Sequence, residues 1–167
     1  MARSRVLVTL SCIAFLSMIA VDIVRAEGGL VGTWRLVSAS SSTDAGIINK
    51  EVYGHNPTGT MIFTAEGRMI TMIAMGERKS LSVSDRIAAP TNERAEAFST
   101  FIAYSGRYSL SAGKETLHID ISSLQNWVNT DQTRFVSLQG DRLTLRTPPM
   151  PRGGIKQTFE LVWQREK

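Results

Sequence analysis

Four side chains with hydrogen-bonding or acid–base capacity lie in segments whose apolar residues alternate as in β-strands: Tyr104, Tyr108, His118 and Arg134. An imidazole can exchange a proton near neutral pH, and a guanidinium binds carboxylates through paired hydrogen bonds. A tyrosine combines a hydroxyl with an apolar ring. Facing the inside of one barrel, these groups would meet the polar end of a small molecule. The sequence therefore predicts them as ligand-binding residues, with Met72 in the apolar wall. Trp127 is a further candidate, either as a contact at the rim or as a plug at the closed end of the barrel.

The direction in which His118 points decides this interpretation. His118 and Asp120 share one face of their segment, and Leu117, Ile119 and Ile121 share the other, because successive strand residues alternate. If the apolar set faces the core, His118 is solvated. If the barrel holds a ligand, a few polar groups face inward. The same question applies to Arg134, whose inward charge would need a partner, so an outward cross-strand pair of His118 and Arg134 remains the alternative.

Several other chemistries lack their residues. The chain has two histidines, His55 and His118, far apart in sequence, and one cysteine, Cys12. No spacing of His, Cys or acidic residues is typical of a metal site, and no glycine-rich loop is placed to hold a phosphate. Asp120 follows His118 too closely on one strand for a Ser-His-Asp arrangement. We expect no metal, no cofactor and no recognisable catalytic set.

Short alternating segments must position the candidate residues. They span 31–40, 47–53, 60–64, 68–75, 104–111, 116–122, 134–139, 142–147 and 158–165, and turns containing glycine separate many of them. This pattern is typical of an all-β barrel or sandwich. Asn56-Pro57-Thr58-Gly59 and Gly140-Asp141 are strong turn signals. We expect a single domain over residues 27–167.

One segment, 90–103, has a helical period instead. Thr91 can cap it, and Ala95, Phe98, Phe101 and Ile102 fall on one face. We expect one inserted amphipathic helix after a loop at 76–89. It would either cover the barrel mouth as a lid or lie against the outside of the barrel.

The first 26 residues have the features of a secretory signal peptide. Arg3 and Arg5 precede an uncharged apolar run over 6–20, and Val24-Arg25-Ala26 resembles a cleavage site. Asp22 ends the run before the ~20 apolar residues that a membrane span needs. A lipoprotein signal would need a small-residue box before Cys12, and Thr9-Leu10-Ser11 is a poor one. We expect cleavage after Ala26 and export to a bacterial periplasm or medium, with no membrane span in the mature chain.

Removal of this leader leaves nearly equal numbers of acidic and basic residues and no cysteine. The basic excess of the whole chain therefore does not predict nucleic-acid binding. The oligomeric state is not predicted.

The order of several short motifs resembles the lipocalin-like (calycin) family of bacterial and fungal proteins. The motifs are Gly32-Thr33-Trp34, Pro57-x-Gly59, Glu66-Gly67-Arg68-Met69, Tyr104-x-Gly106-x-Tyr108, His118 in a strand, Asn126-Trp127, Arg134, Gly140-Asp141-Arg142-Leu143-x-Leu145 and Trp163-x-Arg165. The resemblance implies an all-β fold: a single closed antiparallel barrel whose first and last strands are neighbours. It implies that Gly32, Trp34, Trp163 and Arg165 close the barrel, with the Arg165 cation on the Trp34 ring.

Together these observations predict an exported protein that binds a small, largely hydrophobic ligand inside its barrel. Two alternatives stay open. One is a barrel enzyme of the cyclase or isomerase type that uses His118 and Arg134. The other is a protein-binding or inhibitor barrel that uses the loops at 76–89 and 148–154.

Overall fold

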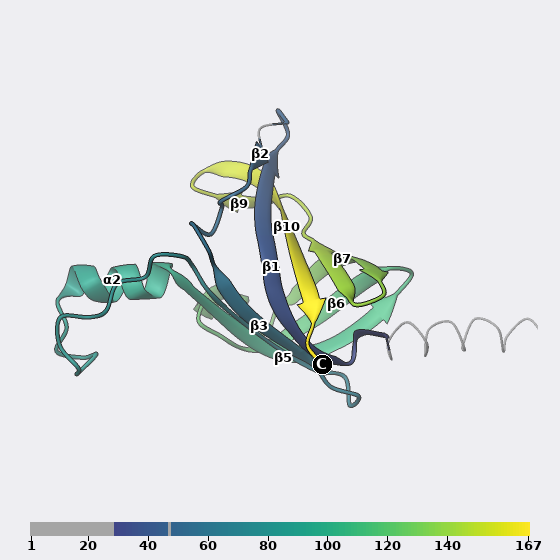
Figure 1. Cartoon of the computed structure of the whole chain (residues 1–167), viewed down its shortest axis with the longest axis horizontal. Coiled ribbons are helices and arrows are strands. Elements are labelled where there is room, and N and C mark those ends of the chain that lie inside the picture. The colour runs from purple at the N-terminus through teal and green to yellow at the C-terminus, as the bar shows by residue number, and fades with distance from the viewer. Residues whose placement is uncertain (1–28, 47) are drawn as a thin grey trace, which may run out of the picture.

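The computed structural model describes residues 29–46 and 48–167, so the predicted signal peptide lies outside the described residues. Eight antiparallel strands form a closed barrel (Figure 1). They are β1 (Gly32–Thr43), β3 (Thr58–Phe63), β4 (Arg68–Ala74), β5 (Phe101–Ser111), β6 (Lys114–Ser122), β7 (Asp131–Gln139), β8 (Arg142–Arg146) and β10 (Ile155–Arg165). Two short strands, β2 (Ile48–Asn49) and β9 (Met150–Arg152), pair alongside β1 and β10, respectively, at one end of the barrel. The predicted all-β closed barrel is confirmed.

The first and last strands close the barrel as predicted. β1 pairs with β10 from Trp34 opposite Arg165 to Thr43 opposite Gln157. A β-bulge interrupts this seam between Leu36 and Ser38, so that Val37 is an extra residue on β1. On its other side β1 pairs with β3, and the remaining strands follow in chain order to β8.

Two predicted elements differ from those observed. The segment 47–53 contributes only Ile48–Asn49 as strand, and Val52 and Tyr53 are buried in the turn that follows. The predicted helix is present as α2 (Thr91–Ser99), but it ends before Phe101 and Ile102. Those two residues begin β5, where Ile102 lies opposite Ile73 of β4, because sheet pairing outweighs the helical period there.

The apolar face expected for α2 is therefore divided between two elements. None of its residues is buried, and Phe98 is half exposed. In Figure 1 the helix projects from the side of the barrel. It does not lie flat against the barrel wall.

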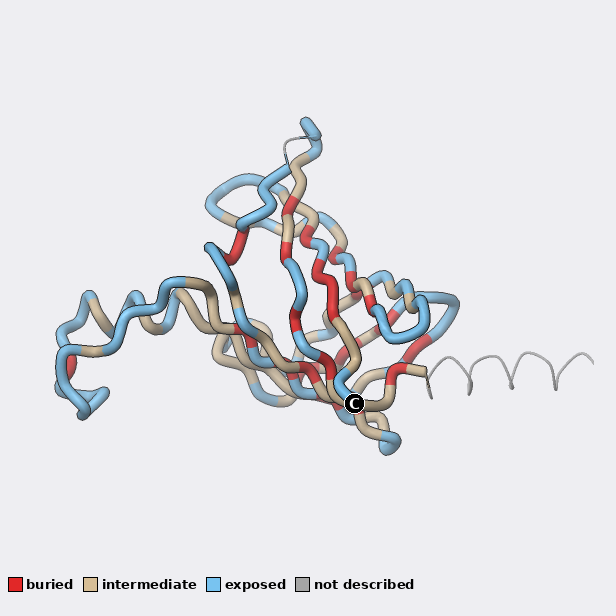
Figure 2. The backbone as a smooth tube through the Cα atoms, viewed as in Figure 1, coloured by how far each residue is buried: buried red, intermediate tan, exposed pale blue. Residues whose placement is uncertain are grey.

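Buried and exposed residues alternate along the strands (Figure 2). On β4, Met69, Thr71 and Ile73 are buried, whereas Arg68, Ile70 and Met72 are exposed. The buried positions of all strands meet in one apolar core. The alternation settles which side chains can reach the interior.

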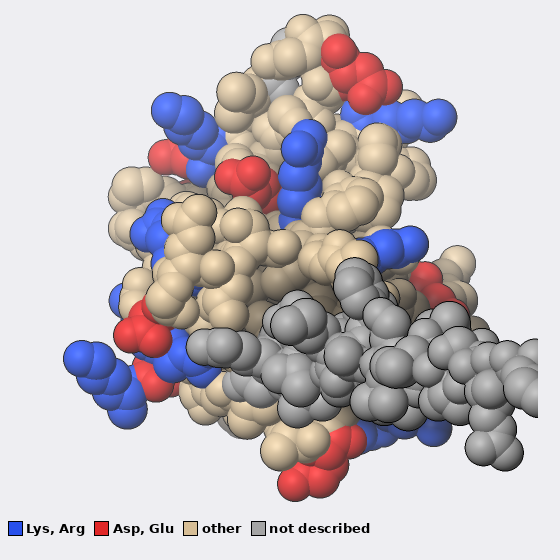
Figure 3. Space-filling view, turned by 90° about the vertical axis from the view of Figure 1, so that its right-hand side faces the viewer, with Lys and Arg blue, Asp and Glu red and all other residues tan. Residues whose placement is uncertain are grey.

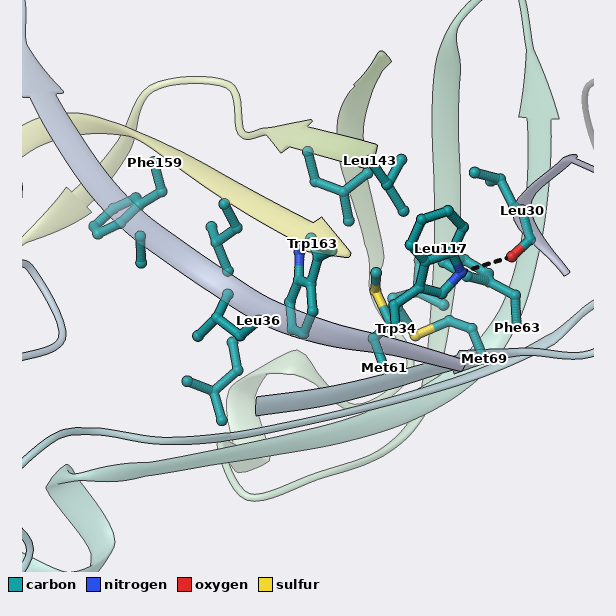
Figure 4. Close-up of a cluster of buried hydrophobic side chains, with 14 of the residues drawn as sticks. Leu30, Trp34, Leu36, Met61, Phe63, Met69, Leu117, Leu143, Phe159 and Trp163 are labelled. Atoms are coloured by element: carbon teal, nitrogen blue, oxygen red, sulfur yellow. Dashed lines mark hydrogen bonds between the residues drawn. The ribbon is translucent and has the colours of Figure 1, made fainter. Parts of the chain in front are cut away.

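A cluster of large apolar side chains, called here the plug, fills one end of the barrel. Its members are Leu30, Trp34, Met61, Phe63 and Met69, each at most 1% exposed. The indole Nε1 of Trp34 donates a hydrogen bond of 2.8 Å to the Leu30 carbonyl (Figure 4).

Arg165 closes the plug from outside. Its guanidinium lies 4.1 Å from the centre of the Trp34 ring and donates hydrogen bonds to the carbonyls of Val31 and Gly29. Gly32 has a φ of +136°, and a Cβ there would lie 2.8 Å from the Arg165 Nη1. Only glycine suits this position, because it has no Cβ and tolerates a positive φ. The Gly-x-Trp motif therefore has a glycine two residues before the Trp34 ring that Arg165 covers.

Among residues 29–46 and 48–167, no helix is long and apolar enough to cross a membrane. On the face of the molecule shown in Figure 3, acidic and basic side chains are interspersed among uncharged ones.

Candidate functional site

The other end of the barrel holds a cavity of about 260 Å³. Its wall is mostly apolar and rich in aromatic rings, including Tyr53, Ile73, Ile102, Tyr104, Trp127, Leu145, Phe159, Leu161 and Trp163. The strands supply this wall through their alternation. On β10, for example, Phe159, Leu161 and Trp163 are every second residue and all are buried.

Two aromatic rings and one cation lie together in the cavity wall near β9. Tyr53 and Phe159 stack with their ring centres 6.4 Å apart. The Arg152 guanidinium lies 5.5 Å from the centre of each ring, and its Nη2 donates to the Val52 carbonyl at 3.2 Å. Burial raises the pKa of Tyr53 to about 12. Its hydroxyl therefore stays protonated at neutral pH.

Tyr104 and Trp127 form a second aromatic pair. Tyr104 projects from β5, and Trp127 ends a short 3₁₀ helix, η1 (Gln125–Trp127), after β6. Their ring centres are 5.5 Å apart at an angle of 72°. This edge-to-face contact holds both rings in the cavity wall.

Trp163 lies between the plug and the cavity. It is 1% exposed, and its position on β10 is opposite Leu36 of β1. Its Nε1 donates to no acceptor among the described residues. Trp163 contributes to the cavity wall, whereas its Nε1 is enclosed without such an acceptor, which costs free energy.

One buried charged residue also lines the cavity. Arg134 of β7 is 8% exposed, and its Nη1 donates to the Thr133 carbonyl at 2.7 Å. Glu115 of β6 lies directly opposite Arg134 in the strand register and is fully buried. Neither Glu115 carboxyl oxygen accepts a hydrogen bond from the described residues. Burial raises the pKa of Glu115 to about 7, and the Arg134 charge opposes that shift.

The predicted interior position of His118 is wrong. Leu117 and Ile119 face the core, so His118 faces outward, where its Nδ1 lies 2.8 Å from the Asp131 carboxylate. The predicted pairing of His118 with Arg134 also fails. His118 lies opposite Asp131, and Arg134 is three residues further along β7, on the opposite face.

Two further predicted residues do not line the cavity. Met72 is 42% exposed on the outer face of β4, since its neighbours Thr71 and Ile73 take the inward positions. Tyr108 packs instead at the plug, edge-on to Phe63 at 4.8 Å, and its hydroxyl donates to the Thr64 carbonyl at 3.2 Å. The structure places Tyr104, Trp127 and Arg134 at the cavity. Their contact with a ligand stays a prediction.

Sequence reasoning missed several cavity or near-cavity residues: Tyr53, Glu115, Arg152 and Phe159. It assigned Trp163 only to barrel closure. Glu115 and Phe159 carried a usable signal, because each alternates in phase with buried apolar residues, Leu117 for one and Leu161 for the other. Tyr53 and Arg152 carried no such signal, since Tyr53 lies in a turn and Arg152 in a three-residue strand.

In the part of the chain that the structure describes, no three His, Cys, Asp or Glu side chains are grouped to hold a metal ion. The described polar groups of the cavity are hydrogen-bonding and cationic.

Comparisons with known proteins identified a matching family and similar proteins. The family described as "Lipocalin-like domain" matches residues 31–166. A 4'-hydroxy-3'-methoxypropiophenone carrier protein from Aspergillus oryzae is 32% identical over 88 residues, which cover 47% of this chain and 79% of that protein. Among solved structures, a lipocalin-like protein from Bacteroides uniformis aligns with 83% of this chain and all of its own, at 14% identity and a TM-score of 0.44.

Proposed function

The chain belongs to the lipocalin-like domain family, and from this premise we propose that it is a carrier that binds one small, largely apolar molecule inside its barrel. The observation that carries the proposal is the cavity of about 260 Å³ with its aromatic and aliphatic wall. Such a wall removes apolar ligand surface from water, which favours binding by about 25 cal/mol for each Å².

The size of the cavity suggests the size of the ligand. Small-molecule pockets commonly range from about 300 to 1,000 Å³, so a volume of about 260 Å³ is at the small end. A molecule of one or two rings suits this space better than a long acyl chain. The aromatic pairs Tyr53–Phe159 and Tyr104–Trp127 suit a flat ring, which can stack on them or meet them edge-on.

The Aspergillus oryzae relative is named as a carrier of an aromatic ketone. That name supports the carrier function proposed for this chain. The enzyme alternative loses its acid–base pair, since His118 and Arg134 occupy opposite faces of the barrel wall. Of the two loops considered for protein binding, 148–154 contributes Met150, Pro151 and Arg152 to the cavity wall.

Titration with 2-acetylnaphthalene, a neutral bicyclic ketone, tests the proposal by calorimetry and native mass spectrometry. We expect one molecule bound per chain. Leu161→Trp should abolish binding, because Leu161 lines the cavity and a larger ring would fill it. The matched control is Ile121→Trp, since Ile121 is 69% exposed.

Two results would contradict the proposal. One is the absence of binding by 2-acetylnaphthalene and by a panel of other one- and two-ring aromatic compounds. The other is binding that survives in a folded Leu161→Trp variant.

We also propose that the protein acts after export and begins at Glu27. The support is the basic, apolar and small-residue pattern over residues 1–26. N-terminal sequencing of the protein from its own host should find Glu27 first. An intact Met1 on a soluble cytoplasmic protein would be incompatible with export.

A further inference from the structure

The barrel interior contains two charged side chains that do not complete an ion pair. Glu115 is fully buried, and Arg134 is 8% exposed. The strand register places them directly opposite each other on β6 and β7, so both project into the barrel. Glu115 nevertheless accepts no hydrogen bond from the described residues. Burying a charged group that has no partner lowers the free energy of unfolding.

The two groups have different positions relative to the cavity. Arg134 is part of the cavity wall, and Glu115 is not. The hydrogen bond from Nη1 to Thr133 is the one that the structure gives for the Arg134 guanidinium. A guanidinium has five N–H donors. Most of its binding capacity is therefore available to a molecule in the cavity, with Glu115 beside it.

Two apolar residues are neighbours of Glu115 in the sheet. Leu110 lies opposite it on β5, and Leu117 is the next inward residue of β6. The Arg134 charge lowers the pKa of Glu115 and so opposes the effect of burial. The other titratable groups in the cavity wall are Tyr53, Tyr104 and Arg152. Arg152 is positioned by the Tyr53 and Phe159 rings and the Val52 carbonyl.

We propose that the carried molecule is an aromatic acid whose carboxylate binds Arg134 and completes the ion pair that Glu115 does not form. This inference rests on the proposed carrier function and specifies its ligand. As the carboxylate enters, Glu115 takes up one proton from the solvent. One negative charge and one proton enter together, so the net charge of the barrel interior does not change. Arg134 then faces one anion at hydrogen-bonding distance, and the carboxyl beside it is neutral.

The first test compares two probes of nearly equal shape, 2-naphthoate and 2-naphthamide. The acid is fully ionised from pH 6 to 9, and the amide is neutral. We expect the wild-type protein to bind 2-naphthoate at least tenfold more tightly at pH 7. Equal affinity for the two probes would overturn the inference and leave the carrier function intact. Failure of both probes, and of neutral aromatic compounds, would instead contradict the carrier function itself.

The second test counts protons. Calorimetry of 2-naphthoate binding at pH 8, in two buffers with different ionisation enthalpies, gives the number of protons taken up per ligand. We expect nearly one proton with 2-naphthoate and none with 2-naphthamide. The dissociation constant for 2-naphthoate should rise on the order of tenfold per pH unit above pH 7, because one proton binds with the ligand. Binding of 2-naphthoate without proton uptake would overturn the role of Glu115.

Two conservative variants separate the partners. Glu115→Gln is always neutral at this position, so it should bind 2-naphthoate tightly with no proton uptake and little pH dependence. Arg134→Gln should lose the preference for the acid and still bind 2-naphthamide. The matched controls are Glu160→Gln and Arg146→Gln, which change the same charges at exposed positions. If Glu115→Gln retained the proton uptake of the wild type, another group would be the proton acceptor and the inference would fail. The two wild-type measurements decide the inference even if a variant does not fold.

Discussion

Each end of this barrel contains a tryptophan and an arginine, but among the described residues the hydrogen-bonding groups of the two residues are satisfied only at the plug. At the plug, the Trp34 indole donates to the Leu30 carbonyl, and Arg165 bonds to Val31 and Gly29 and lies on the Trp34 ring. At the cavity, the Trp163 indole has no acceptor in the described part of the chain, and Arg134 has one backbone hydrogen bond. A tryptophan and an arginine whose groups are satisfied within the chain stabilise the fold. At the cavity, the Trp163 N–H is enclosed without a partner among the described residues, and Arg134 keeps N–H donors available for another molecule.

Electrostatics follows the same division. Arg165 lies 3.2 Å from the Asp141 carboxylate at the protein surface, where neither group is fully buried. Arg134 lies beside a carboxyl that is buried and accepts no hydrogen bond from the described residues. Within the described part of the chain, the polar and charged groups are satisfied at the plug and are not satisfied at the cavity. Substitutions at the two ends test this difference.

Trp34→Ala should have the largest effect. Truncating a fully buried aromatic side chain costs about 3–5 kcal/mol of unfolding free energy, and Trp34 is 0% exposed. Urea denaturation measures the loss. Because the plug and the cavity are separate, the protein that remains folded should bind 2-acetylnaphthalene with little change. If Trp34→Ala were as stable as the wild type, the plug would not be the stabilising cluster inferred here.

The pH dependence of stability tests the buried carboxyl. Burial raises the Glu115 pKa from its ordinary 4.5 to about 7. Between these values the folded state binds more protons than the unfolded state, so the free energy of unfolding falls as pH rises. Ionising Glu115 in the fold should cost on the order of 3 kcal/mol by pH 8. Urea denaturation from pH 4.5 to 8 should show this loss in the wild type, and Glu115→Gln should remove it. An identical pH profile in both proteins would place the Glu115 carboxylate in a better-solvated environment than the structure gives it.

Trp163→Phe isolates the free indole donor. The ring still fills space next to the cavity, and no described hydrogen bond is lost, so stability should change by less than about 1.5 kcal/mol. Binding of 2-acetylnaphthalene should change by less than about threefold, because the Trp163 Nε1 is enclosed and the Phe ring keeps most of the wall surface; a larger loss would mean that this N–H reaches the ligand. Calorimetry measures this change. The matched change at the plug, Trp34→Phe, breaks an existing hydrogen bond and should lower stability more than affinity.

His118→Ala should have the smallest effect. Its contact with Asp131 is on the protein surface, and exposed ion pairs contribute about 0–1 kcal/mol. We expect unchanged affinity for both naphthalene acids and ketones, measured by calorimetry. A large loss of affinity would mean that His118 reaches the cavity after all, and that the division between the inner and outer faces of β6 is wrong.

The closure of the barrel was predicted through the resemblance of the sequence to the lipocalin-like family, and the structure gives its physical reasons. Gly32, Trp34 and Arg165 each have a local reason for their identity: a φ that suits glycine, a ring that fills the plug, and a cation that lies on that ring. Most of the strands were also recognisable from alternation, because each has one face in a dry core and the other in water.

The binding residues were harder to predict because alternation identifies two faces without saying which is inside. His118 was assigned inward by its chemistry, although Leu117 and Ile119 determine the direction of β6. Glu115 was missed because the strand was taken to begin at Thr116, whereas β6 begins two residues earlier, at Lys114. Tyr53 depends on a turn, and such positions are decided by tertiary contacts that span the whole chain.

The bulge at Val37 links the seam to the volume of the cavity. Inward residues of β1 are spaced Trp34, Leu36, Ala39 and Ser41, so the extra residue changes the spacing once without turning any later side chain outward. A bulge bends and twists its strand, and this one lies beside Trp163, where the plug gives way to the cavity. The room available to a ligand is therefore determined partly by backbone length. A chain lacking Val37 would keep every residue that lines the cavity and would enclose a differently shaped space. The choice of ligand in such barrels can therefore change through the deletion of one residue that contacts no ligand.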